Sequence, residues 1–390
     1  MSIYLIALTT FVLFLSTHVG VPVLPALSAS LGADATRMAA ILSSTSMTIV
    51  LLQFFTGILA DRWGKRAVLV GGAALGGLSS LLCAVAPSWQ SLLLLRILGG
   101  VADAITMPAL LGLTAEIAEG RQGAFFGVLR SSQGLSFIVA PVIGGWLAFY
   151  SLRTPFLVDG LLSFVAGLTF LLYVREKKGG RSGHGLEQLR HLGTLLQDRR
   201  IYAFILFGLA DTFTFPVISA FLPTKAQGLG YAPWQISAML TCEAIGFTVA
   251  CALVGPLSDR WGRRPFVILP QPCIIAACLG LAFSRNLAAL IAFYTLFGLG
   301  GASTFLMSTA MMADITPAES AATRLGAFDA LMDLGIFVGP ALALTLHRLV
   351  GAIDPILILA ALPALAAWPA ALIIQDTLVR RKRTVTAQGE

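Results

Sequence analysis

The sequence predicts an all-α membrane protein, with twelve transmembrane helices in two pseudo-symmetric six-helix bundles. Hydrophobic residues make up 57% of its 390 residues and charged residues only 12%, and the mean hydropathy is +0.86. This balance excludes an ordinary soluble domain. The segment GILADRWGKRAVL at 57–69 recurs as GPLSDRWGRRPFV at 255–267, about half a chain length later. A tandem repeat of this size predicts two copies of one membrane unit.

Each bundle is predicted from six apolar runs of about 20 residues, long enough to cross a hydrocarbon core of roughly 30 Å as helices. The first run is long and lacks a basic start, so we interpret it as a retained helix rather than a cleaved signal peptide. The twelve runs lie at 3–24, 39–60, 67–86, 90–112, 124–148, 155–174, 201–222, 235–257, 264–283, 287–311, 325–345 and 353–374.

The repeat offset is nearly constant along the chain and defines the domain organisation. LPALSASLG at 24–32 returns as LPTKAQGLG at 222–230, and a prolyl step at 140–141 returns at 339–340. In the linker between the repeats, leucines at helical spacing predict a short amphipathic helix on the cytoplasmic surface, with a solvated linker as the alternative. The predicted parts are an N-terminal bundle, the linker, a C-terminal bundle and a basic cytoplasmic tail, at 1–174, 175–200, 201–378 and 379–390.

Charge placement predicts the orientation. If both termini are cytoplasmic, the inside segments hold 19 Lys and Arg and the outside segments hold five. This asymmetry satisfies the positive-inside rule, so we expect both termini in the cytoplasm of a cell, with the bacterial inner membrane as the expected location. The net charge of +7 is explained by topology and does not indicate nucleic-acid binding.

Enzymatic function classes are not indicated. The five cysteines all fall inside apolar runs, without metal-ligand spacing or a disulfide framework. The sequence has no Ser-His-Asp spacing, no HExxH and no phosphate loop, and no soluble segment reaches the size of a nucleotide-binding domain. We therefore expect no metal, no cofactor and no ATP-driven pump. If the protein moves a solute, the energy must come from an ion or substrate gradient.

The two repeated loops resemble the signature of the major facilitator superfamily, G-x-L-a-D-r-x-G-r-k, between helices 2 and 3 and between helices 8 and 9. The first copy matches at every signature position, and the second differs at two, with serine after Leu257 and Arg264 at the last position. The resemblance covers the whole chain and implies two six-helix bundles that work by alternating access.

Two further motifs resemble those of the twelve-span drug:proton antiporter branch. LLLLRILGGVADA at 92–104 is similar to the helix 4 motif of proton-coupled members, with Arg96 in place and Gly99 where glutamine is usual. SFIVAPVIGGWL at 136–147 is similar to the helix 5 antiporter motif, with serine and alanine in place of two glycines. The resemblance therefore implies a multidrug antiporter.

The repeated loops are the predicted gating latch. Asp61 and Asp259 are acceptors able to cap the positive N-terminus of a neighbouring helix, and the adjacent Arg62 and Arg260 can pair across the loop. The resemblance implies that this cluster closes the cytoplasmic side, and a plain topology-anchoring turn is the alternative. The predicted latch residues are Gly57, Asp61, Arg62, Gly64, Arg66, Gly255, Asp259, Arg260, Gly262 and Arg264.

Small residues and prolines at matched places in helices 5 and 11 predict packing and hinge positions between the two halves. Small residues allow close helix approach, and proline removes a backbone hydrogen bond and permits a bend. These positions are Gly134, Pro141, Gly144, Gly145, Gly335, Gly339 and Pro340.

Ionisable groups at membrane depth are the candidates for proton coupling, because each costs ~2.5–3.5 kcal/mol on insertion. Arg96 and Asp103 are seven residues apart, so they share one helix face and are the predicted coupling pair, followed by Glu243 and Asp211. Burial favours the neutral carboxylate and a nearby arginine favours the ionised one, so a conformational change can load and release a proton. A permanent structural ion pair is the alternative. Weaker candidates are Arg130, Asp329 and Asp333.

The predicted substrate cavity lies between the halves near mid-membrane, lined by helices 1, 4, 7 and 8. His18 can titrate near neutral pH, although such a residue is more often hydrogen-bonded core. The candidate cavity residues are Asp211, Glu243, His18, Gln53, Phe207 and Tyr294.

These observations favour proton-coupled efflux of small apolar or cationic compounds. Embedded acids outnumber embedded arginines, which favours cations and protons over anions. One alternative is transport of a specific metabolite such as a sugar, an amino-acid derivative or an organic anion. Another is a sensor or lipid-handling protein of the same fold. The expected partners are a small-molecule substrate, protons and the lipid bilayer, with the protein acting as a monomer.

Overall fold

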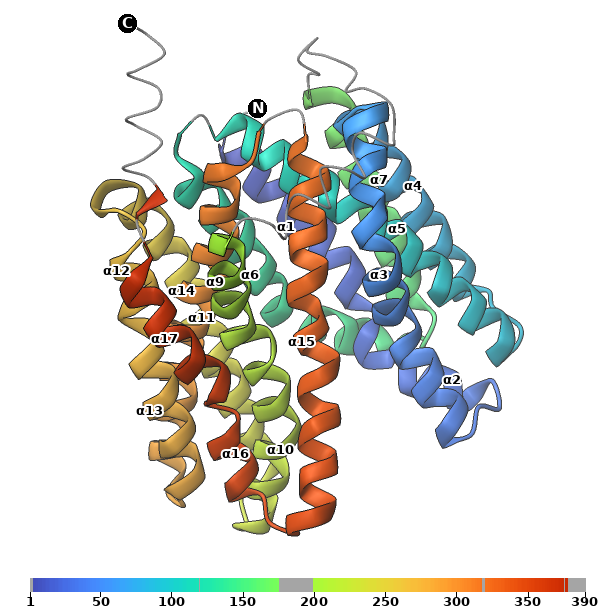
Figure 1. The fold of residues 1–390 in the computed structure, drawn as a ribbon. Helices are drawn as coiled ribbons and strands as arrows, with labels where there is room; N and C mark the ends of the chain where they lie inside the picture. Colours follow the sequence, from blue (N-terminus) through green and yellow to red (C-terminus); the bar gives the residue numbers. More distant parts are fainter. Residues whose placement is uncertain (1–2, 119, 175–198, 318–319, 375, 378–390) are drawn as a thin grey trace, which may run out of the picture. The chain divides into compact units, whose positions relative to one another are not determined.

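The computed structural model describes residues 3–118, 120–174, 199–317, 320–374 and 376–377. Regular structure in these ranges is helical throughout (Figure 1), which confirms the predicted all-α class. Eleven helical segments among them are long and apolar enough to cross a membrane, or twelve if a helix bent by 63° counts as one span. The predicted linker helix and the basic tail lie outside the described residues, apart from the residues that begin α9.

The structure packs into two compact units. The described parts of unit 1 are 3–117, 135–174, 317 and 320–330. Within it α3 and α5, α4 and α7, α4 and α5, and α1 and α7 pack in pairs. Its helices are α1 (Ile3–Val19), η1 (Val21–Val23), α2 (Leu24–Ser30), α3 (Ala35–Trp63), α4 (Lys65–Ala84), α5 (Trp89–Ile117) and α7 (Thr154–Tyr173).

Unit 2 is described over 118, 120–134, 199–316, 331–374 and 376–377. Several of its predicted spans are broken into two helices, and proline stands in the first turn after two of the breaks, where the missing N–H costs no helical hydrogen bond. Its helices are α9 (Arg199–Thr212), α10 (Thr214–Gly228), α11 (Pro233–Trp261), α12 (Pro265–Ile268), α13 (Pro270–Phe283), α14 (Leu287–Ile315), α16 (Asp354–Leu359) and α17 (Leu362–Ile373).

Two long helices belong to both units. The first turns of α6 (Gln122–Ala148) lie in unit 2, and from Leu135 onward the helix lies in unit 1. The first turns of α15 (Ala321–Val350) lie in unit 1, and from Leu331 onward the helix lies in unit 2. In each repeat, one helix therefore begins in one unit and ends in the other.

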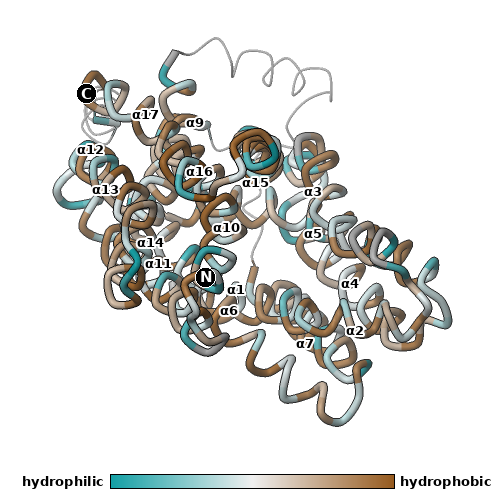
Figure 2. The backbone as a smooth tube through the Cα atoms, turned by 90° about the horizontal axis from the view of Figure 1, so that it is seen from below, coloured by the Kyte–Doolittle hydropathy of each residue, from teal (hydrophilic) through white to brown (hydrophobic). Residues whose placement is uncertain are grey.

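Hydrophobic residues dominate the helices of both units (Figure 2). In unit 2, Leu222, Tyr294 and Phe297 are among a large group of fully buried side chains. In unit 1, α4 and α7 approach so closely that a Cβ at Gly77 would lie 3.0 Å from the Gly160 carbonyl oxygen. Large apolar side chains such as Leu168 are exposed, as expected for helices surrounded by lipid.

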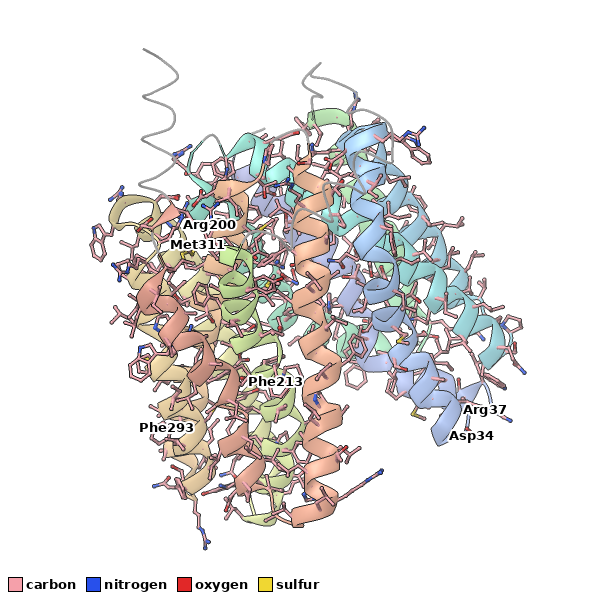
Figure 3. All side chains as sticks on the ribbon, in the orientation of Figure 1. Asp34, Arg37, Arg200, Phe213, Phe293 and Met311 are labelled. Carbon is pink, nitrogen blue, oxygen red and sulfur yellow. The ribbon has the colours of Figure 1, made fainter. Side chains whose placement is uncertain are left out.

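One helix start is stabilised by an exposed pair. Asp34 caps α3 by accepting a hydrogen bond from the Arg37 backbone N–H at 2.8 Å, and its carboxylate lies 3.3 Å from the Arg37 Nε (Figure 3). The Arg37 guanidinium also lies 4.7 Å from the ring centre of Trp89. These contacts hold α3 against the start of α5 at one end of unit 1.

Candidate functional site

The first repeat loop caps α15 through Asp61, whose side chain is fully buried in the last turn of α3. Its carboxylate accepts hydrogen bonds from the backbone N–H groups of Ala322 at 3.1 Å and Thr323 at 2.7 Å. These groups belong to the first turn of α15, where N–H groups have no partner within the helix and the helix dipole attracts negative charge. Lys65 lies 3.6 Å from Asp61 and also pairs with Glu116.

The second repeat loop reproduces this arrangement at the start of α6. Asp259 accepts hydrogen bonds from the backbone N–H groups of Gly123 at 2.9 Å and Ala124 at 2.7 Å. Arg263 takes the place of Lys65, with Nη1 2.7 Å from Asp259 and Nε 3.1 Å from Asp314. Burial lowers the pKa of Arg263, but Asp314 and Asp259 raise it more, so its pKa lies above its usual value. The guanidinium is therefore permanently charged.

The predicted latch glycines have geometric reasons. A Cβ at Gly57 would lie 2.4 Å from the Ala322 carbonyl oxygen, and a Cβ at Gly255 would lie 2.4 Å from the Gly123 carbonyl oxygen. Gly64 and Gly262 adopt φ of 94° and 92°, a region that favours glycine. The loops therefore need glycine both for close approach and for the turn.

The predicted latch arginines divide into two groups. Arg66 donates to the Leu171 carbonyl oxygen near the end of α7, and Arg264 donates to the Leu372 carbonyl oxygen near the end of α17. The two arginines thus anchor the last helix of each repeat.

Arg62 and Arg260 are exposed and have no partner among the described residues, so the cross-loop pairing predicted for them is not observed. Each directly follows its aspartate on a helix, which turns the two side chains about 100° apart. Lys65 and Arg263, two residues that were not predicted, form the ion pairs instead.

The predicted hinge residues pack in different ways. A Cβ at Gly134 would lie 2.5 Å from Thr248 Oγ1, so only this glycine meets a helix of the other sequence repeat. Gly144 faces the Val19 backbone at the end of α1, and Gly145 faces open space. Gly335 and Gly339 pack against α9 and its junction with α10, in their own repeat, and Pro141 and Pro340 lie inside α6 and α15.

The predicted coupling pair is not a direct ion pair. Arg96 and Asp103 are both half-buried on α5 and interact electrostatically, but no ion pair joins them in the described part of the chain. Arg96 interacts in the same way with Asp159 and with His18. The arginine is therefore the centre of a wider polar group in unit 1.

Asp159 on α7 belongs to this group and is absent from the predicted residues. Its side chain is 2% exposed. It accepts a hydrogen bond from Ser80 Oγ at 2.7 Å, and Ser163 Oγ lies within hydrogen-bond reach of both Asp159 and Ser16. The signal was present in the sequence, because Asp159 is the one carboxylate in the apolar run 155–174.

Two predicted cavity residues of unit 1 have local partners. His18 is half-buried, with Nδ1 2.8 Å from the Phe14 carbonyl oxygen and its ring edge-on to Phe137 at 4.5 Å. Both contacts lie within unit 1. Gln53 is buried and donates from Nε2 to Asp329 on α15 at 2.9 Å.

Unit 2 brings three predicted residues together. Asp211 on α9 and Glu243 on α11 are 8% and 5% exposed and interact electrostatically. The fully buried Tyr294 of α14 interacts with both, and its hydroxyl has no hydrogen-bond partner in the described structure. Arg130 on α6 interacts with Asp211. The fourth predicted residue, Phe207, is fully buried beside Phe204, at 6.5 Å between ring centres.

The family follows from comparison with known proteins. The model of the Major Facilitator Superfamily matches residues 6–233 and 203–389. The chain belongs to this superfamily. The proteins of this superfamily are membrane transporters and not enzymes, and the fold of the chain is theirs.

Relatives of this superfamily chain include drug-resistance proteins. It is 30% identical over 183 residues to the quinolone resistance protein NorA of Staphylococcus aureus, covering 46% of the chain and 47% of NorA. The chain thus matches about half the length of the first relatives. It is 23% identical over 345 residues to the MFS-type transporter MJ1560 of Methanocaldococcus jannaschii, covering 87% and 89%. The fold is similar to that of the human organic anion transporter MFSD10, with TM-score 0.75, 17% identity and coverage of 95% and 98%.

Proposed function

We propose that this transporter exports small apolar or cationic compounds in exchange for protons. The observation that carries the proposal is the buried acid pair Asp211 and Glu243, set beside the hydroxyl of Tyr294 in unit 2. Two carboxylates held in apolar surroundings attract a cation or a proton and repel an anion. The likeness of part of the chain to a quinolone resistance protein supports the same substrate class.

The proposal includes the membrane architecture that the sequence predicts. Twelve spans form two six-helix bundles, 1–174 and 201–378, with both termini in the cytoplasm of a bacterial cell. The monomer alternates its access between the two sides of the inner membrane. Small-molecule substrate and protons are its partners, and it needs no cofactor.

Release and closure of the latch control the change from one side of alternating access to the other. Asp61 and Asp259 each hold the first turn of a helix that begins in one unit and ends in the other. Releasing both caps frees both helix ends together, because the two contacts are equivalent in the repeat. Closure of the latch is thus coupled to helices that reach both units.

Proton coupling is assigned first to Arg96 and Asp103. The two groups interact without a direct contact, so a small movement of either changes the balance between the ionised and neutral carboxylate. Asp159 joins them as a second buried carboxylate near the same arginine. A permanent ion pair would hold its carboxylate ionised in every state and is disfavoured here.

A flux assay in proteoliposomes tests the proposal. The protein is reconstituted with an imposed pH gradient and a panel of cationic dyes, quinolones, sugars, amino acids and organic anions. Uphill, pH-driven movement of cationic compounds is expected. Asp211→Asn should lose this movement, and the exposed control Asp34→Asn should keep it. Movement of one neutral or anionic metabolite without a pH requirement overturns it in favour of a specific carrier. Absence of any flux by a folded protein favours a sensor or lipid-handling role.

A further inference from the structure

The first turns of α6 dock in unit 2 through a single helical face. Residues 123, 127, 130 and 134 follow the spacing i, i+4, i+7 and i+11, which places them in one stripe. Gly123 meets Gly255, Gly127 meets the Cys251 backbone, and Gly134 meets Thr248, each too closely for a Cβ. Three of the four positions are therefore glycines that let α6 lie directly on α11.

The fourth position of this stripe is Arg130. Its side chain is 1% exposed, and its guanidinium lies 4.3 Å from the ring centre of Phe305 on α14. Its Nη1 donates to Gln133 at 3.1 Å. A buried guanidinium is costly unless an acid balances it. Asp211 Oδ1 lies 2.3 Å from the position of a Cβ at Gly301, one turn before Phe305 on the same face of α14. Arg130 and Asp211 therefore approach one face of α14 and interact electrostatically, without a direct ion pair among the described residues.

The repeat shows that docking itself does not require this arginine. Shifted by 199 residues, the stripe corresponds to 322, 326, 329 and 333 on α15, where one glycine is kept, Gly326, which meets Pro108 too closely for a Cβ. The residue equivalent to Arg130 is Asp329, which accepts a hydrogen bond from the neutral Gln53. The aspartate cap and one close glycine contact are kept while the charge at this position is reversed. Docking of such a helix end therefore does not need a positive charge here, and we assign the charge of Arg130 to the acids of unit 2.

We propose that Arg130 is a docking-dependent counter-ion, which neutralises Asp211 only while Asp259 holds the first turns of α6. This rests on the proposed function of Asp211 as a cation or proton site. Arg130 lies about two turns along the helix from the amides that Asp259 caps, so both leave unit 2 when this helix end undocks. Undocking then exposes the acids to a proton or a cationic substrate.

The relationship is reciprocal. A proton or cation at Asp211 removes the partner of Arg130, which weakens the docking of α6 to the same extent that docking weakens binding of the cation. Loading of the site therefore favours release of the latch. The groups that face Asp211 are Arg130 from α6, Glu243 and Cys251 from α11, and Tyr294 from α14.

The test measures undocking without any transport. Ala124→Cys places a thiol at the first turn of α6, beside the amide that Asp259 caps. Its alkylation rate is followed against pH in the full-length protein in nanodiscs. The rate is divided by that of the exposed thiol of Arg37→Cys at the same pH, because acidification lowers the reactive thiolate fraction of any cysteine. Acidification should raise this relative rate about tenfold, the change that corresponds to 1.4 kcal/mol. In Arg130→Gln the relative rate should be high at every pH, and in Asp211→Asn the acid response should be lost.

Controls separate this proposal from simpler causes. Arg130→Lys keeps the charge and should keep the acid response, and Asp34→Asn, at an exposed carboxylate of unit 1, should leave the response at Ala124→Cys unchanged. If the response survives in Asp211→Asn, a group other than Asp211 senses the acid and the proposal is wrong. Asp211→Asn decides this even if Arg130→Gln does not fold. Because no flux is measured, failure of the transport proposal gives a different result from failure of this one.

Discussion

The Asp259 carboxylate lies 2.7 Å from the backbone nitrogen of Ala124, and this contact joins the end of α11 to the first turn of α6. The Asp61 carboxylate makes the same contact, at the same distance, with Thr323 in α15. In both cases the acceptor is an aspartate of a signature loop and the donors are backbone groups. The duplicated sequence thus builds one joint twice.

Removing the charge from either aspartate should slow transport. Asp61→Asn keeps an acceptor but loses the attraction to the helix dipole and to Lys65, which is worth up to ~2 kcal/mol in partly buried geometries. We expect a loss of about tenfold or more in transport rate, with equilibrium substrate binding largely unchanged, and a similar effect for Asp259→Asn. Flux and binding are measured on the same preparation. Loss of equilibrium binding by folded Asp61→Asn would show that the loop acts on the cavity and not as a latch.

Close approach at the latch predicts a second effect. Gly57→Ala puts a methyl group 2.4 Å from the Ala322 carbonyl oxygen, so α3 and α15 must separate. Overpacking of this kind costs ~1–3 kcal/mol, and the thermal midpoint of the purified protein should fall. Gly145→Ala is the matched control, because a Cβ there meets nothing within 4 Å. Equal midpoints for the two variants would contradict the close packing of α3 on α15.

Orientation is open to direct labelling. Arg37 lies at the start of α3 and Arg260 at the end of α11, and both side chains are exposed. With cytoplasmic termini, an impermeant thiol reagent added to whole cells should label Arg37→Cys and spare Arg260→Cys until the cells are opened. Arg263 is unsuitable for this purpose because its side chain is fully buried between two carboxylates. The reverse labelling pattern would overturn the predicted topology.

The sequence predicts a structural feature where a single residue type is enough to form it. Apolar runs predict the spans, and Asp61 and Asp259 are predicted as helix caps because the motif is repeated. The capped groups of Ala322 and Gly123 are backbone N–H groups, which every residue except proline possesses, so the sequence gives no sign of them. Lys65 and Arg263, and not Arg62 and Arg260, pair with the aspartates because of the direction in which each side chain leaves the end of its helix. Composition does not reveal this direction.

The last prediction concerns the carboxylates around Arg96. Asp103 is half-buried and interacts with Arg96 without a direct ion pair, so its proton affinity responds to small changes in their separation. Asp103→Asn should abolish proton-driven accumulation and still permit downhill exchange of substrate, and Arg96→Ala should shift the pH profile of transport. Both are measured as flux with and without a pH gradient.

Asp159→Asn distinguishes the two carboxylates of this group. Asp159 is already satisfied by Ser80 and lies beside Ser163, and an asparagine oxygen can accept the same hydrogen bonds. If Asp159 only fastens α7 to α4, its amide should keep uphill transport and Asp103→Asn alone should lose it. If Asp159→Asn loses proton-driven accumulation while Asp103→Asn retains it, Asp159 carries the proton. Arg96 is then the counter-ion of Asp159 and not of Asp103. Comparison of the two amides in one flux assay therefore identifies the carboxylate that carries the proton.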